Sequence, residues 1–364
     1  MRKNQIFVSY GNQAKKMAKE LLAEIKIEDE LNKNHLIALK PNLNNATKSK
    51  QGATTDPEIV SGIIEYLQER DFYNIAIMEG SWVGLDSEKA FEACGYNEVS
   101  NKYNVPLYNL QKDKFIKRSF QGKEIEIADK VLKADYIINI PVLKGHCQTT
   151  ITCALKNLKG CISNSEKRRF HRLGLHKPIA YLNKLLKQNL IIIDGIYGDL
   201  DFEEGGNPVQ MNRIIAAADP VLVDSYAAEL LGYSNAEIEY IEIAAKIGVG
   251  KKDLEEAEII ELNKDQATKI NYSSRKINKL TYKIEPLDVC SACYGSLIHA
   301  LKILEQKGKL NEITDYIKIG QGYKGKTSTG IGVGRCCQGV EKYIDGCPPS
   351  AKEIREFLER EYNI

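Results

Sequence analysis

The fold is decided by a short apolar run, YIINIPV at residues 136–142, which runs on into Leu143 and Lys144. A strand with one wet face alternates apolar and polar residues, whereas this run is almost continuously apolar. Such a run is typical of a parallel strand that is covered on both faces. We therefore expect residues 136–142 to form an inner strand of a sheet that helices flank.

The segments before this run repeat the order strand, loop, helix, strand. Residues 36–39 (LIAL) and 74–78 (NIAIM) have the composition of short buried strands, and a helix is expected to start between them at Asp56-Pro57. Asp56 suits the N-cap of that helix, and Pro57 suits its first position. The same Asp-Pro pair recurs at residues 219–220. This alternation predicts an α/β fold, with a mostly parallel sheet and helices on both faces.

A second, smaller part is expected near the end of the chain. Five of the nine cysteines lie between Cys290 and Cys347, and hydrophobic periodicity is weakest between residues 251 and 278. We therefore place an α/β domain at residues 1–280 and a smaller α/β cysteine module at residues 281–364.

The cysteine spacing of this module predicts a metal centre. Cys290 and Cys293 form a C-x-x-C pair, Cys336 or Cys337 supplies a third thiol, and Cys347-Pro348 closes the set. Thiolate-rich sites with a Cys-Pro end are typical of iron–sulfur clusters. We predict one [4Fe–4S] cluster held by Cys290, Cys293, Cys336 and Cys347. Cys336 is preferred over Cys337 because it directly follows the flexible Gly334-Arg335 step.

Two alternatives to this centre remain open. A structural zinc ion with four thiolates is disfavoured because zinc ribbons use two compact C-x-x-C pairs, and the module contains one. If neither Cys336 nor Cys337 bound the cluster, three ligands would leave one iron open as a Lewis acid. Cys94, Cys147, Cys153 and Cys161 fit no common metal spacing, so we interpret them as packing residues. Cys147, which lies beside His146, is the candidate if a nucleophilic thiol exists.

Polar residues follow several of the predicted strands, and in an open parallel sheet the carboxyl ends of the strands share one crevice. The expected catalytic residues are His146, Lys144, Glu79 and Asp194. The expected substrate-binding residues are Lys40, Asn42, Lys156 and Asn157. Such a set suits an anionic substrate, with Lys40 and Lys144 holding the anion and His146 moving a proton. Taken singly, each residue is better explained as a solvated charge, a turn cap or a structural side chain. Residues 167–176, which include Lys167, are expected to form a basic loop.

The sequence GQGYKGKT at residues 320–327 matches the phosphate-loop expression and follows a strand-like segment. That motif works only if a helix begins at its Lys-Thr, so that helix amides can bind phosphate. The next residues, STGIGVG, do not suit a helix. We therefore do not expect nucleotide binding, and we attribute the glycines to close wrapping of a cluster.

Composition excludes several other classes of protein. The formal net charge of +2 provides no electrostatic argument for a nucleic-acid or membrane partner, and no segment is long and apolar enough to span a bilayer. The strand-like start of the chain is unlike a signal peptide, and nine cysteines are an odd number for a disulfide framework, so a cytoplasmic location is expected. Richness in Lys, Ile and Asn suggests an anaerobic prokaryotic source.

Several blocks of the sequence resemble, in order, those of the domain-of-unknown-function 362 family. They are KPN at residues 40–42, TDP at 55–57, EGS at 79–81, ADYIINIPVLKGH at 134–146, ALKNLKG at 154–160, DG at 194–195 and ADPVLVD at 218–224. The resemblance implies an association with iron–sulfur modules, although the compact C-x-x-C-x-x-C-x-x-x-C-P run is missing here. It implies no particular reaction.

The leading functional hypothesis is an iron–sulfur oxidoreductase that acts on a small anionic substrate and exchanges electrons with a redox partner protein. One alternative is a cluster-dependent lyase, isomerase or racemase without net redox chemistry. Another is an electron-transfer adaptor that is not an enzyme. The sequence does not define the substrate, the electron partner or the oligomeric state.

Overall fold

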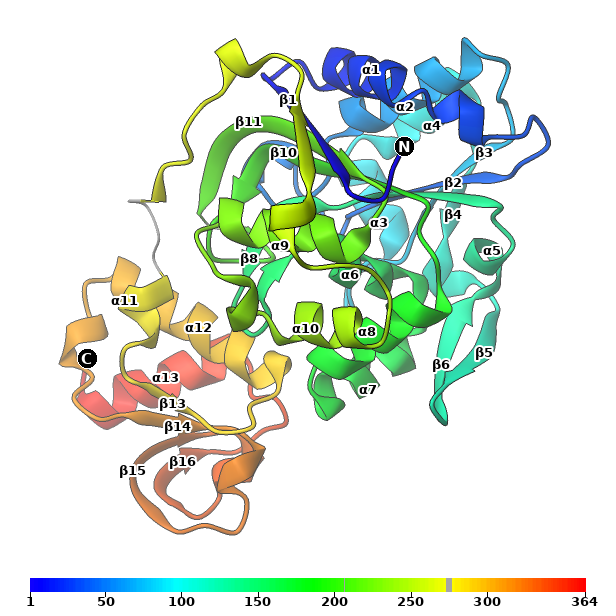
Figure 1. The fold of residues 1–364 in the computed structure, drawn as a ribbon. Helices are drawn as coiled ribbons and strands as arrows, with labels where there is room; N and C mark the ends of the chain where they lie inside the picture. The colour runs from blue at the N-terminus through cyan, green and yellow to red at the C-terminus, as the bar shows by residue number, and fades with distance from the viewer. Residues whose placement is uncertain (206, 273–276) are drawn as a thin grey trace. The chain divides into compact units, whose positions relative to one another are not determined.

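The computed structural model describes residues 1–205, 207–272 and 277–364 (Figure 1). The chain divides into two compact units. The larger unit comprises Met1–Arg169 and His176–Ser274, and the smaller unit comprises Phe170–Leu175 and Arg275–Ile364. No helix in the described part of the chain is both long and apolar enough to cross a membrane.

Ten strands form the central sheet of the larger unit, counted over its described residues. They are β1 Gln5–Tyr10, β2 Ile37–Pro41, β3 Ile75–Glu79, β4 Leu107–Asn109, β7 Tyr136–Ile140, β8 Val142–His146, β9 Thr150–Thr152, β10 Leu190–Asp199, β11 Pro208–Ala217 and β12 Glu258–Glu261. Their order is β12-β1-β11-β10-β7-β2-β3-β4, with β8 paired to β10 and β9 paired to β8. Only β11 with its two neighbours and β8 with β9 are antiparallel pairs among these described strands. The sheet is therefore mixed and mostly parallel, which confirms the predicted fold class.

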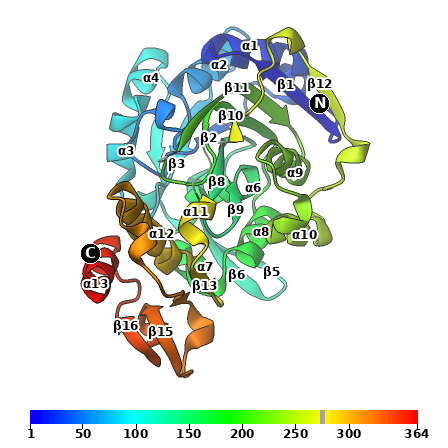
Figure 2. The ribbon, with the colours of Figure 1, turned by 90° about the vertical axis from the view of Figure 1, so that its left-hand side faces the viewer.

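Helices cover both faces of this sheet (Figure 2). They are α1 Ala14–Ile25, α2 Pro57–Gln68, α3 Ser87–Ala93, α4 Tyr96–Tyr103, α5 Asp129–Leu132, α6 Ala154–Asn157, α7 Asn164–Leu173, α8 His176–Leu185, α9 Pro220–Leu230 and α10 Glu239–Lys246. Successive side chains of a strand point to opposite faces. Phe7 and Ile192 accordingly join α1 and α2 in one core cluster, whereas Ile6 and Ile191 are equally buried outside it. Both faces of the sheet are therefore buried, as the continuous apolar runs predict.

The Asp-Pro pairs start helices as expected. The Asp56 side chain accepts a hydrogen bond from the Glu58 amide at the start of α2. The Asp219 side chain accepts bonds from the Val221 and Leu222 amides at the start of α9. Each cap satisfies amides that have no partner within the helix.

Some local predictions were wrong. Lys144 and His146 lie within strand β8, not in a loop after it, because Gly145 pairs with Ile151 of β9. Gly145 fits there because the Leu200 carbonyl oxygen lies 2.4 Å from where its Cβ would be. Asp194 lies in the middle of β10, because the strand continues past a register shift after Gly195.

Other errors concern helices and a hairpin. The expected basic loop contains two helices, α7 and the start of α8, so Lys167 is helical. The sequence of residues 264–276 favours a helix, but the structure forms a 3-10 turn at Lys264–Gln266, and residues 273–276 lie outside the described residues. A β-hairpin of β5 Phe115–Phe120 and β6 Lys123–Ala128 was not anticipated.

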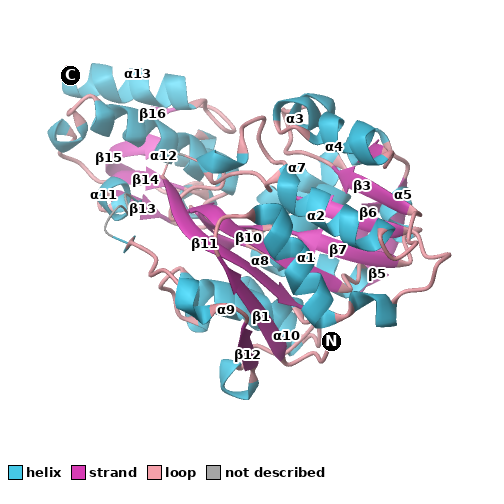
Figure 3. Cartoon of the chain, turned by 90° about the horizontal axis from the view of Figure 1, so that it is seen from above, coloured by secondary structure: helices cyan, strands magenta, loops and turns pink. Residues whose placement is uncertain are grey.

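The smaller unit contains a parallel sheet of its own (Figure 3). Its strands, in spatial order, are β13 Ile284–Pro286, β14 Ile317–Ile319, β15 Ser328–Val333 and β16 Val340–Ile344. Its helices are α11 Ile277–Thr281, α12 Ser291–Gln306 and α13 Ala351–Tyr362, of which α12 and α13 pack together. Strand β15 begins directly after Lys326-Thr327, so these residues do not start the helix that a phosphate loop needs.

Candidate functional site

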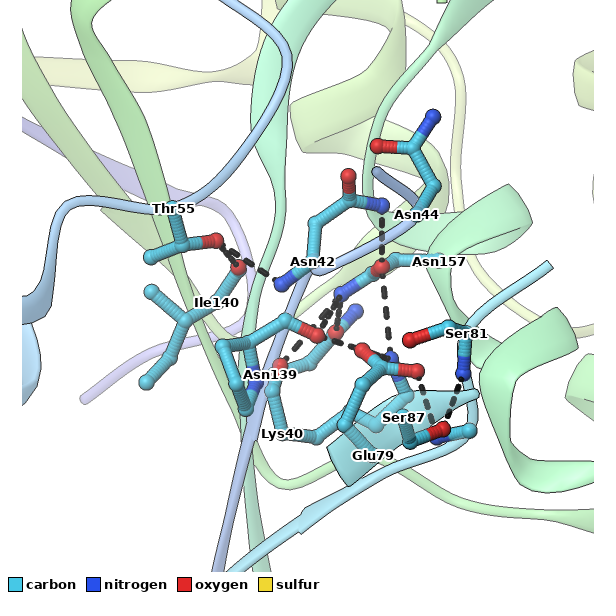
Figure 4. Close-up of polar contacts among 12 residues, drawn as sticks. Lys40, Asn42, Asn44, Thr55, Glu79, Ser81, Ser87, Asn139, Ile140 and Asn157 are labelled. Atoms are coloured by element: carbon cyan, nitrogen blue, oxygen red, sulfur yellow. Dashed lines mark hydrogen bonds and ion pairs between the residues drawn. The ribbon is translucent and has the colours of Figure 1, made fainter. Parts of the chain in front are cut away.

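A buried ion pair links the ends of β2 and β3. Lys40 Nζ lies 2.6 Å from Glu79 Oε2, and the two side chains are 0% and 3% exposed. The Lys40 ammonium also donates to the Pro41 carbonyl, and Glu79 Oε1 accepts from the Gly80 amide (Figure 4). Both charged groups are therefore removed from water, and each is the ion-pair partner of the other.

Two asparagines extend this pair into a network. Asn157 Oδ1 accepts bonds from Lys40 Nζ at 3.4 Å and from Asn42 Nδ2 at 2.7 Å (Figure 4). Asn42 Oδ1 in turn accepts from Lys144 Nζ at 2.7 Å, and Lys144 also donates to Asn44 Oδ1 at 3.1 Å. Five of the predicted residues therefore form one connected buried network, although separate strands and helix α6 supply them.

A second cluster joins two further predicted residues through a glutamate that sequence reasoning missed. Glu203 Oε1 lies 2.7 Å from Lys156 Nζ, and Glu203 Oε2 lies 3.0 Å from His146 Nε2. His146 Nδ1 accepts bonds from the Gln148 and Thr149 amides, so it carries no proton and the ring is neutral. Burial agrees with this state, because it lowers the pKa of His146 to about 4. With both nitrogens engaged, His146 is poorly placed for the proton transfer we expected of it.

Burial lowers the pKa of several lysines in this region. Burial, with the charge of Lys156, lowers the pKa of Lys144 and that of Lys159 to about 7. Burial also lowers the pKa of Lys167, to about 8, although its ammonium donates to the Gly80 and Ser81 carbonyls. These cations therefore form an environment that attracts anions.

Asp194 lies near Lys144 of the buried network. Among the described contacts, it makes no hydrogen bond to a residue of that network. Its carboxylate accepts bonds from the Asp56 and Ile196 amides, at 2.8 and 3.1 Å. Burial and the charge of Asp56 raise its pKa to about 7, against the opposing effects of those amides and of Lys144. Asp194 thus ties β10 to the N-cap of α2.

The raised pKa of Asp194 predicts a pH effect on stability. In the folded protein Asp194 keeps its proton up to about pH 7, whereas in the unfolded chain it loses the proton near pH 4. Protonated Asp194 therefore contributes stability that is fully present below pH 4 and is lost as the pH rises through about 7. Asp194→Asn should remove the dependence. Between pH 4 and 7 the wild type should lose stability and the Asp194→Asn variant should not. The free energy of unfolding of the variant minus that of wild type should therefore rise by about a few kcal/mol over this range. Urea titrations that follow Trp82 emission would measure this, and a pH-independent difference would contradict it.

Gly160 allows the backbone after α6 to approach the ion pair. A Cβ at this position would lie 2.1 Å from Glu79 Oε1 and 2.7 Å from Lys40 Nζ. Gly160→Ala should therefore destabilise the larger unit by about 1–3 kcal/mol, because neither charged group can move away without losing its partner. Gly295→Ala is the control. A Cβ there meets nothing within 4 Å inside helix α12, and alanine should stabilise that helix slightly. Equal urea midpoints for Gly160→Ala and wild type would contradict the account.

Neighbouring thiols affect the pKa of two cysteines of the smaller unit. The pKa of Cys293 is raised by a hydrogen bond with Cys290, then by burial and by charges on Cys290, Cys347 and Cys336. Burial, followed by the charges of Cys290 and Cys347, raises the pKa of Cys336. Cys337 differs, because it is fully buried and its Sγ lies 3.4 Å from the Lys318 carbonyl oxygen. Among the described residues, no three His, Cys, Asp or Glu side chains are grouped closely enough to hold a single metal ion.

The remaining thiols have the character of packing residues. Cys94, Cys153 and Cys161 are buried, and burial raises the pKa of Cys161 and that of Cys147 to about 12. A thiol must ionise to act as a nucleophile. Cys147 is therefore a poor candidate for that role.

The fold and the site define an α/β protein with a buried, lysine-rich polar network at the strand ends of its main sheet. The chain belongs to the family described as a domain of unknown function, DUF362, which matches residues 37–229 and so more than half of its length. That match includes every predicted residue of the network.

The known proteins that are similar to this chain include a curated relative and a solved structure. A thylakoid-associated protein of Synechocystis sp. is 24% identical over 229 residues, which cover 58% of this chain and 68% of that protein. The lactate racemase apoprotein of Thermoanaerobacterium thermosaccharolyticum has a TM-score of 0.42 and 12% identity, over 64% of this chain and 57% of that one. This chain thus spans less than two thirds of the racemase, and the likeness is too distant to support an argument about function.

Proposed function

We propose that this chain is an iron–sulfur oxidoreductase that binds a small anionic substrate beside the buried, lysine-rich polar network of its larger unit. The main support for the proposal is that the charges of Cys290 and Cys347 act on both Cys293 and Cys336, so that thiols from three separate segments of the smaller unit lie within electrostatic reach of one another. Four thiolates are the ligand set of a [4Fe–4S] cluster, which transfers single electrons when bound. A complete set of four favours electron transfer over an open Lewis-acid iron.

The surroundings of the thiols also suit a cluster. Gly334 directly precedes the Arg335–Cys337 turn with a φ of +91°, a conformation that glycine adopts without strain. A Cβ on Gly334 would approach Cys293 Sγ to 3.4 Å. The backbone at Gly334 thus lies close to the Cys293 thiol, as close wrapping of a cluster requires.

The larger unit supplies the groups that bind the substrate and hold a proton. Lys156 and His146 present an ammonium and an N–H to the same carboxylate, that of Glu203. Lys144 Nζ is suited to hold or release a proton near neutral pH, because burial lowers its pKa to about 7. Asn42 and Asn44 fix the Lys144 ammonium in place, and Asn157 joins Asn42 to the Lys40–Glu79 pair.

The metal and sulfide content of anaerobically purified protein tests the proposal. About four irons and four acid-labile sulfides per chain are expected, with a brown colour. A colourless protein with one zinc per chain would contradict it. An adaptor that only transfers electrons would keep its function after Lys144→Met, whereas the proposed enzyme would lose turnover.

A further inference from the structure

We propose that the Glu203 carboxylate occupies the substrate-binding position of the larger unit, and that a carboxylate group of the substrate displaces it. This assignment rests on the anion site of the proposed function and names the chemical class of its ligand. The site consists of Lys156 Nζ and His146 Nε2, with the ammonium groups of Lys144 and Lys159 nearby.

Glu203 is the exposed member of an otherwise buried cluster. Its side chain is 28% exposed, whereas those of Lys156 and His146 are 1% and 4% exposed. Of these three side chains, only that of Glu203 is partly open to solvent. A ligand that replaced Glu203 would enter from solvent without disturbing the sheet.

The backbone at Glu203 is held independently of its side chain. Asn44 Nδ2 donates a 2.9 Å bond to the Glu203 carbonyl oxygen, while Asn44 Oδ1 accepts from Lys144. The carboxylate can therefore rotate into solvent while the main chain keeps its anchor. Such a movement needs only a change of side-chain rotamer and no change of the backbone.

The charges favour exchange of one anion for another. Burial opposes ionisation of Glu203, but the charges of Lys156 and Lys144 and the hydrogen bond from His146 outweigh it and lower its pKa well below the usual value. If the carboxylate left without replacement, buried cations would lose their counter-charge, which is strongly unfavourable. Replacement by a second carboxylate keeps that balance, because no new charge is buried alone.

The geometry selects a carboxylate. The two oxygens of Glu203 are used separately, one for the ammonium at 2.7 Å and one for the imidazole N–H at 3.0 Å. A planar group with two equivalent oxygens reproduces both contacts. Chloride, with its single atom, would make only part of this arrangement.

The test is rescue of Glu203→Ala by acetate, in cluster-containing protein. The variant should unfold at a lower temperature than wild type, because Lys156 loses its partner. Acetate should raise the unfolding temperature of the variant toward that of wild type. Above the dissociation constant of acetate, each tenfold increase in its concentration should raise this temperature by roughly 2–5 °C, whereas chloride at equal ionic strength should not raise it. Wild type should respond weakly, because its own carboxylate competes.

Three variants complete the test. Glu203→Gln fills the same space, remains folded and should show no acetate rescue. Glu204→Ala removes a neighbouring carboxylate whose charge affects the pKa of Lys156 less than that of Glu203 does, and it should also show none. Adding Lys156→Met to Glu203→Ala should abolish the rescue.

Two outcomes would overturn the assignment. One is an equal effect of acetate and chloride on Glu203→Ala, and the other is equal rescue of Glu204→Ala. Iron content is measured in each sample, so a missing cluster counts against the proposed function and not against this site.

Discussion

Replacing Cys336 by Ser is expected to reduce the bound iron from about four atoms per chain to less than one, whereas replacing the adjacent Cys337 should leave it unchanged. The two thiols differ in their surroundings. Cys336 is half-exposed and within electrostatic reach of Cys290 and Cys347. Cys337 is fully buried, with its Sγ against the Lys318 carbonyl. Iron and sulfide counts on anaerobically reconstituted protein would measure the difference.

The pair of variants is its own control, because the two positions are neighbours in one 3-10 turn, Arg335–Cys337. Serine at either position changes one sulfur to oxygen, so a general loss of folding would affect both variants. A cluster retained in Cys336→Ser and lost in Cys337→Ser would show that the ligand assignment is wrong. Loss in both would mean that the turn cannot accept serine, and Ala at each position would then separate ligation from packing.

Lys40→Met should produce the largest loss of stability in the larger unit, about 3–5 kcal/mol. The substitution leaves the Glu79 carboxylate, which is 3% exposed, without the ammonium that lies 2.6 Å from it. Asn157 Oδ1 loses one of its donors as well. Urea unfolding followed by Trp82 emission would report on this unit, since Trp82 is the one tryptophan of the chain and lies three residues after Glu79.

A double variant distinguishes a lost ion pair from lost packing. Lys40→Met combined with Glu79→Gln removes both charges, and the amide oxygen of the new side chain can still accept from the Gly80 amide, as Glu79 Oε1 does. It should recover most of the lost stability. Lys117→Met breaks an exposed pair with Glu124, whose side chains are 62% and 60% exposed, and should change little. If the double variant were no more stable than Lys40→Met, the charge of Glu79 would not explain the loss.

The sequence was most informative where local chemistry determines local structure. The apolar run at residues 136–142 indicated a strand dry on both faces, and the Asp-Pro pairs indicated where two helices begin. Lys40, Asn42 and Glu79 meet because the parallel neighbours β2 and β3 end at one edge of the sheet. Asn157 joins them from helix α6 and Lys144 from within β8. The apolar run at residues 136–142 does not predict that the chain forms two separate strands here, β7 and β8. Pro141 lies between the two apolar segments, and its presence is compatible with one strand or with two.

Glu203 could not be found in this way. It lies in an irregular segment between β10 and β11, where neither a helical nor a strand period exists, and its partners Lys156 and His146 are more than 45 positions away. Lys167 was missed for a different reason. Its charged neighbours suggested a loop, whereas α7 buries its side chain against the Gly80 and Ser81 carbonyls. Long-range contacts of this kind depend on the assembled fold.

Electron paramagnetic resonance of anaerobic protein, before and after reduction with dithionite, tests the central claim most directly. The account predicts one reduced [4Fe–4S] cluster per chain, with a spin signal that integrates to about one and disappears in Cys336→Ser. A protein that gives no signal in either state and contains one zinc per chain would contradict the account.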